Sequence, residues 1–251
     1  MAVRFSGEMR NIDRVTLWTT LLAGTAWTCL LFEDKHHNPF PVSLPVDHAS
    51  LSEASLWGRV SPDMLYEEAT HWILMVTAMM LPLLVVPIRQ VAFRSYRWRR
   101  SKAIAGFLGG YIGIWMFAGI LCGWVFWILG VAELVPASVA APAALLIAAI
   151  WQLSSFRAAA MRRCHRTIAL APRGLAADLD CIRFGLSHGF ACVAVCLPLM
   201  LATMISMHGI AAAAVLALLL YFERGYLPVN PVIPGIMLVY CSGAMVYSLL
   251  S

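Results

Sequence analysis

The sequence predicts an all-α protein, a polytopic transmembrane helix bundle of about seven spans with a cytoplasmic N-terminus. The first observation is composition: of 251 residues, 61% are hydrophobic and 12% are charged, and the mean hydropathy is +0.78. A soluble domain would carry roughly twice that share of charged residues. The second is length, because several apolar runs reach the roughly 20 residues that cross a bilayer as a helix. The third is the placement of the positive charges.

The apolar runs divide the chain into an anchor, a core and a last helix. The predicted spans are 15–32, 69–88, 104–130, 136–156, 184–206, 208–222 and 232–250. The second span is expected to begin as an exposed helix near Pro62. The sequence there has a helix-capping residue, then a proline and then an acidic residue, which is typical of a helix start. Spans five and six are separated at Met207-His208-Gly209, which suits a surface turn. We therefore expect an anchor helix and outer loop over 1–68, a membrane core over 69–224 and a C-terminal membrane helix over 225–251.

Positive charges fall on alternate sides of these spans. With the N-terminus in the cytoplasm, every Lys and Arg except Lys35 and Arg59 lies inside, as the positive-inside rule requires. Anionic lipid headgroups explain the basic loops more simply than nucleic acid does. We therefore expect the lipid bilayer as a partner, no nucleic acid, and a location in a bacterial inner membrane.

The fifth span carries soft metal ligands at steps of four residues, which places each about one helical turn above the last. The residues are His188, Cys192, Cys196, Met200 and Met204. Thiolate, thioether and imidazole hold Cu(I) or Zn(II), and a coordinating group inside a membrane is a functional hypothesis by default. Pro198 removes a backbone hydrogen bond in the same span. The competing interpretation is a packed helix face, because Met and Cys fit apolar cores well.

Two other segments could contribute ligands. Met75 and Met79 follow His71 at steps of four in span two, at a membrane depth similar to that of Cys196. They predict a mid-membrane thiolate–thioether site or, alternatively, a Met-rich packing seam. Cys164 in the cytoplasmic loop is a candidate loading site, although its basic neighbours would both oppose a cation and favour the thiolate.

Span three predicts close helix packing. Its small-xxx-small pairs let backbones approach closely in lipid. The glycines concerned are Gly106, Gly109, Gly110, Gly113, Gly119 and Gly123.

Catalytic patterns are absent from the chain. It has no phosphate loop, nucleophile elbow, paired carboxylate within a span or His-Glu metalloprotease helix, so we expect no enzymatic activity. No internal repeat is apparent, which argues against a secondary transporter.

Residues 69 to 224 carry the motifs of a known family. The motifs are Trp72-x-x-Met75-x-x-Ala78-Met79-Met80-x-Pro82, Gly110-Tyr111-x-x-x-Trp115, Gln152-Leu153 with Arg157 and Cys164, and Gly185-x-x-His188-Gly189-x-x-Cys192-x-x-x-Cys196 followed by Met200, Met207 and Glu223. In these the chain resembles the predicted metal-binding integral membrane proteins, a bacterial domain of unknown function sometimes described as copper-handling. The chain departs from the family where a third cysteine and a tryptophan are usual beside Cys196, and where Ala160 replaces a further cysteine.

The leading hypothesis is a soft-metal binding protein for trafficking or delivery. The metal expected is Cu(I), with zinc less favoured, and the partner is a membrane or periplasmic protein. The candidate ligands are His188, Cys192, Cys196, Met200, Met79, Met75 and Cys164. Cys192 and Cys196 would form the centre, and His188 an inner gate. The alternative is a non-catalytic structural or assembly subunit of a larger membrane complex.

Overall fold

The computed structural model describes residues 2–33, 62–128, 137–171, 173–205 and 210–225, with a few single residues after them. The helices are α1 (Ala2–Glu33), α3 (Pro62–Met80), η1 (Leu81–Leu84), α4 (Val85–Arg94), η2 (Arg97–Arg99), α5 (Arg100–Ile128), α7 (Ala137–Gln152), α8 (Ser155–Cys164), α9 (Gly174–Ile205) and α10 (Ile210–Gly225). Within these ranges every regular element is helical and there is no strand, which confirms the all-α prediction.

The described helices account for most of the predicted spans. Four segments are long and apolar enough to cross a membrane: 15–32, 69–94, 97–125 and 174–205. The α7–α8 pair would make a fifth if it counts as one bent span. The helix α10 is shorter, at 16 residues. The turn predicted at 207–209 and most of the last predicted span lie outside the described residues. The expected helix start at Pro62 is confirmed.

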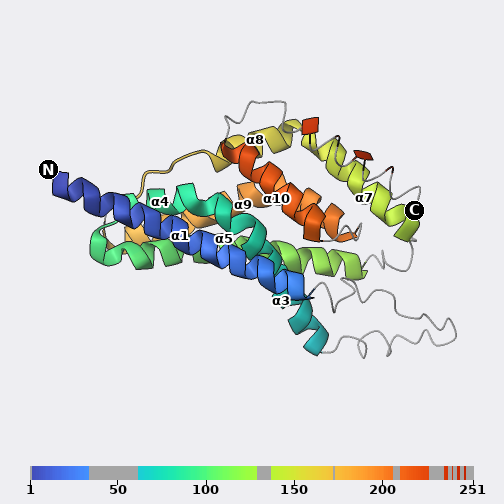
Figure 1. The fold of residues 1–251 in the computed structure, drawn as a ribbon, viewed down its shortest axis with the longest axis horizontal. Coiled ribbons are helices and arrows are strands. Elements are labelled where there is room, and N and C mark those ends of the chain that lie inside the picture. The colour runs from blue at the N-terminus through green and yellow to red at the C-terminus, as the bar shows by residue number, and fades with distance from the viewer. Residues whose placement is uncertain are drawn as a thin grey trace.

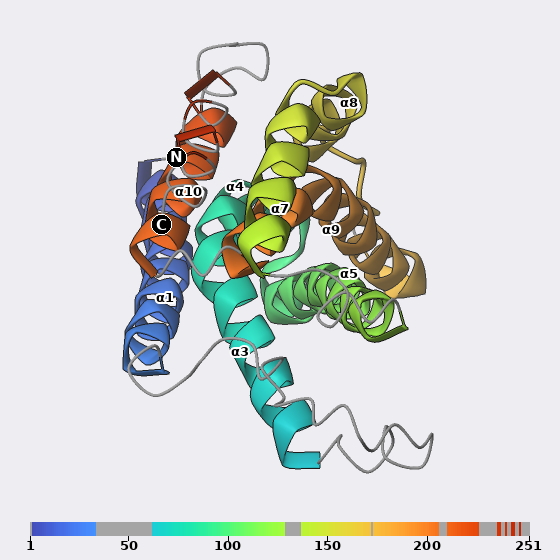
Figure 2. The ribbon, with the colours of Figure 1, turned by 90° about the vertical axis from the view of Figure 1, so that its right-hand side faces the viewer.

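Helices α5 and α9 form the most extensive interface of the bundle and lie side by side in Figure 2. Glycine makes their approach possible. A Cβ atom on Gly185 would lie 2.1 Å from the carbonyl oxygen of Phe107, and one on Gly110 would lie 2.6 Å from that of Ile182. The predicted packing role is therefore confirmed for Gly110, whereas Gly109 and Gly113 have nothing within 4 Å.

Two tryptophans bind carbonyl groups that prolines have released. Proline has no N–H, so the carbonyl four residues before it loses its helical partner. Pro198 releases the carbonyl of Ala194 in this way, and the indole of Trp151 donates to it at 2.9 Å. Pro82 likewise releases the carbonyl of Ala78, which accepts from Trp27 at 3.1 Å. These bonds fasten α7 to α9 and α1 to α3.

The chain turns sharply between α7 and α8. The two axes differ by 68° across the break, and α8 begins where the Ser154 hydroxyl accepts from the backbone N–H of Arg157 at 3.1 Å. Figures 1 and 2 show α8 at one edge of the bundle, beyond the end of α7. The sequence prediction did not foresee α8 as a helix; its bend brings the end of α8 back over α9.

Candidate metal centre

A cluster of sulfur atoms lies in the middle of α9. The sulfur of Cys192 is 3.7 Å from that of Met80, at the end of α3, and Cys196 lies about one helical turn beyond Cys192 on α9. The hydroxyl of Tyr111, on α5, donates to the Cys192 sulfur at 3.1 Å. All four side chains are buried in the main hydrophobic core. Three helices therefore bring two thiols, a thioether and a phenol hydroxyl together away from solvent.

Arg224 reaches this cluster from the end of α10. Its guanidinium Nη2 lies 2.8 Å from the Cys192 sulfur and 3.7 Å from the sulfur of Cys164, the last residue of α8. The imidazole Nε2 of His165 lies 3.1 Å from the Arg224 carbonyl oxygen, which also ties α8 to α10. The third cysteine is thus near the other two, with an arginine side chain beside both Cys164 and Cys192.

A buried ion pair lies next to Arg224 in the chain. Arg157, on α8, donates to the Glu223 carboxylate at 2.5 Å, and both side chains are less than a tenth exposed. The sequence analysis left Glu223-Arg224 outside the candidate site. Buried charges are paired because an isolated charge is strongly unfavourable in an apolar surrounding. Here the ion pair joins α8 to α10 next to the sulfur cluster.

His188 lies one helical turn from Cys192 in an aromatic enclosure. The rings of Phe107, Tyr111 and Phe184 have their centroids 5.9 to 6.1 Å from the imidazole centroid. His188 is only 4% exposed, and neither ring nitrogen has a hydrogen-bond partner among the described residues. The sequence analysis named His188 as a candidate ligand, and a buried ring nitrogen without a hydrogen-bond partner can accept one.

The predicted methionines share the core, but the one in contact with the cysteine is their neighbour. Met75, Met79 and Met200 are all buried in the core cluster that contains Cys192 and Cys196. It is Met80, however, whose sulfur meets Cys192. Adjacent helical residues point about 100° apart, so a one-residue change of register decides which methionine faces the thiols.

The sequence analysis also missed Tyr111 and Arg224 as parts of the cluster. Tyr111 appeared there only within a family motif, and Arg224 was not among the candidate residues. A signal did exist for Arg224, since an arginine at the end of an apolar helix must find a partner. The expected basic neighbours of Cys164 do not surround it: Arg162, Arg163 and Arg166 are all exposed.

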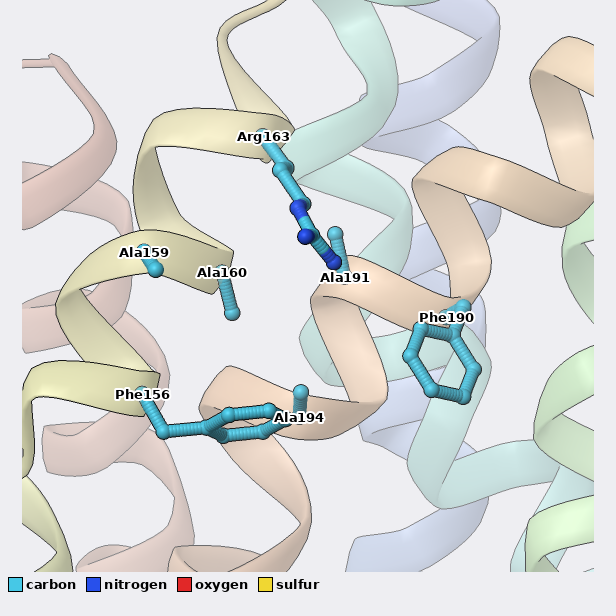
Figure 3. Close-up of a pocket in the computed structure, with 7 residues that line it drawn as sticks. All are labelled: Phe156, Ala159, Ala160, Arg163, Phe190, Ala191 and Ala194. Atoms are coloured by element: carbon cyan, nitrogen blue, oxygen red, sulfur yellow. The ribbon is translucent and has the colours of Figure 1, made fainter.

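A separate groove lies between α8 and α9, as Figure 3 shows. It has a cavity volume of about 50 Å³ and is lined mainly by alanine and phenylalanine, with the Arg163 side chain reaching across it. Ala160, where the resembling family has a further cysteine, lines this groove. None of the predicted ligands does, so the groove is distinct from the sulfur cluster.

The donor set of the cluster favours a soft, monovalent metal. Thiolate and thioether sulfurs select Cu(I), whereas structural zinc takes four ligands drawn from Cys, His and carboxylates. Within the described part of the chain, no three His, Cys, Asp or Glu side chains are grouped as metal ligands would be. Cys192, Cys196 and Met80 therefore fit a low-coordinate copper ion better than zinc.

Comparison with known protein families places most of the chain in a family. The model of a family described as PpoB2, copper chaperone, matches residues 69–246. The match begins at the first residue of the predicted core, and it includes every residue of the sulfur cluster. No curated protein matches the chain, and no solved structure does.

Proposed function

The chain belongs to the PpoB2 copper chaperone family, and on that basis we propose that it binds Cu(I) in a membrane and delivers it to an acceptor protein. The family match confirms the copper-handling resemblance found in the sequence. The location, the cargo and the delivery step are our proposal. The apolar composition and the four helices long enough to span a bilayer support an inner-membrane location.

The observation that carries the proposal is the contact between Cys192 and Met80 in the buried core. Cys192 and Cys196 would hold the ion as thiolates, and the Met80 thioether would add a third soft ligand. Tyr111 donates to the Cys192 sulfur and would orient it, as groups bonded to metal ligands commonly do. Burial keeps water and competing ligands away from the ion.

His188 fits a second position on the path of the ion. It lies about 6 Å along α9 from Cys192, at 1.5 Å per residue, and its ring nitrogens are buried without a hydrogen-bond partner among the described residues. Aromatic faces attract cations, so the enclosure by Phe107, Tyr111 and Phe184 would stabilise an ion passing between them. His188 would receive the ion before the cysteines bind it.

The test is metal binding by the purified full-length protein under reducing conditions. Wild type should retain one equivalent of Cu(I), and replacing Cys192 and Cys196 together with alanine should abolish it. Cys181→Ala is the matched control, because Cys181 is equally buried on α9 and, among the described residues, makes no hydrogen bond with Cys192 or Met80. Sub-stoichiometric copper in wild type, or full copper in the double variant, would contradict the proposal.

The second candidate is a non-catalytic assembly subunit of a membrane complex. It is favoured by the absence of a group of three or more His, Cys, Asp or Glu side chains among the described residues. Under this alternative the protein would co-purify with a stoichiometric partner and contain no metal.

A further inference from the structure

Arg224 is the charged group in direct contact with the sulfur cluster. Its guanidinium contacts Cys192 and Cys164, at 2.8 and 3.7 Å. Its neighbour Glu223 is paired with Arg157, and in the described part of the chain no carboxylate forms a salt bridge with Arg224. Arginine keeps its positive charge at any pH at which proteins are studied. The cluster therefore contains one fixed positive charge, whereas the nearby ion pair has no net charge.

We propose that Arg224 makes the site selective for the charge of the metal, favouring a monovalent ion over a divalent one. This rests on the proposed function, and it goes beyond it by naming the residue that selects the class of ion. The geometry requires no movement of Arg224, because a guanidinium can keep its hydrogen bond to a sulfur that also binds a metal.

Counting charges explains the direction of the selectivity. Cysteines bind metals as thiolates, so loading releases their protons. Two thiolates and Arg224 sum to a single negative charge, and a monovalent ion brings the site to neutrality. A divalent ion would leave an uncompensated positive charge in a buried, apolar surrounding, which is strongly unfavourable. Without Arg224, the two thiolates carry two negative charges, so a divalent ion would bring the site to neutrality.

The net charge of the site matters because the surroundings of the cluster are hydrophobic. Tyr111, Met80 and Cys196 surround Cys192 and are at most 1% exposed. Unit charges a few ångströms apart interact far more strongly here than in water. Softness alone would not separate two thiophilic ions that differ only in charge, whereas a fixed guanidinium does.

The experiment compares Ag(I) with Cd(II), two thiophilic ions with the same d-electron count and different charge. Dissociation constants for both are measured by chelator competition on the full-length protein in lipid nanodiscs. Arg224→Gln should lower the preference for Ag(I) over Cd(II) on the order of a hundredfold, as expected for unit charges about 5 Å apart at an effective dielectric constant of about 20. Arg224→Lys, which keeps the charge, should retain most of the preference.

A second variant has the opposite expected sign. Glu223→Gln keeps a hydrogen-bond acceptor for Arg157 but removes one negative charge next to the cluster, so the preference for Ag(I) should rise. This variant keeps the proposal testable if Arg224→Gln does not fold. Arg163→Gln, which changes an exposed arginine on α8, is the control and should leave the ratio unchanged.

The outcomes separate this inference from the proposed function. An unchanged ratio in Arg224→Gln with both ions still bound, or an equal fall in Arg224→Lys, would overturn the role of the Arg224 charge. An unchanged ratio in Glu223→Gln, if Arg224→Gln does not fold, would do the same. Binding of neither ion by wild type would instead overturn the proposed function.

Discussion

The interface between α5 and α9 and the junction of α8, α9 and α10 are built on opposite principles. At the first, glycines let two backbones touch, and aromatic side chains fill the remaining space. At the second, the buried Arg157–Glu223 pair and the half-buried Arg224 meet cysteines in an apolar core. The first depends on shape and the second on charge. The comparison indicates that α5 and α9 form a closely packed frame, and that α8 and α10 bring charged side chains and Cys164 against it.

The largest effect is expected from breaking the charge pair of the junction. Arg157→Leu leaves Glu223 buried without its partner, and removing one member of such a pair costs about 3–5 kcal/mol of folding free energy. Thermal or denaturant unfolding in detergent measures this. Arg163→Leu on the exposed side of α8 should change stability by less than about 0.5 kcal/mol. Equal effects of the two variants would show that the pair does not stabilise the junction.

The second-largest effect is expected at the glycine contacts between α5 and α9. Gly185→Ala places a Cβ atom 2.1 Å from the Phe107 carbonyl oxygen, so α5 and α9 must separate, at a cost of about 2–3 kcal/mol. Gly113→Ala on α5 has open space around it and should be neutral or slightly stabilising because alanine favours helix. The same unfolding assay compares them. If Gly185→Ala is tolerated as well as Gly113→Ala, shape does not govern this interface.

Tyr111 lies in the interface between α5 and α9 and also contacts Cys192. Its replacement should therefore lower both stability and metal affinity modestly. Tyr111→Phe removes the hydroxyl that donates to Cys192 but keeps the ring in the interface. Stability should fall by about 1 kcal/mol, and Cu(I) affinity by about tenfold, as for other groups bonded to metal ligands. Tyr66→Phe, at an exposed position on α3, is the control. Unchanged affinity in Tyr111→Phe would confine Tyr111 to a packing role.

The smallest effect is expected at the bond between Trp151 and Ala194. Trp151→Phe leaves the Ala194 carbonyl without a donor and should cost about 1 kcal/mol. Pro198→Ala restores a helical N–H to that carbonyl. The loss caused by Trp151→Phe should therefore be smaller in the Pro198→Ala background, and a double-mutant cycle measures the difference. Strict additivity would argue against this account of the bond.

Much of the frame could be predicted from the sequence. Helical spans follow from long apolar runs, and the packing role of Gly110 follows from its small-xxx-small spacing, because both depend on local sequence. The cysteines at 192 and 196 also share a face by spacing alone. Cys181 joins that face because α9 begins at Gly174, ten residues before the predicted span. The assignment of metal ligands remains a prediction.

The sequence by itself determined that this chain is helical and apolar, that it carries soft ligands along one helix, and that it resembles a copper-handling family. Only the tertiary structure decided which groups meet those ligands. Met80 rather than Met79 contacts Cys192 because of the rotation of α3, and Arg224 reaches it because α10 packs against α9. Periodicity fixes the face of a single helix, but the rotation and crossing of separate helices depend on how all their side chains pack together.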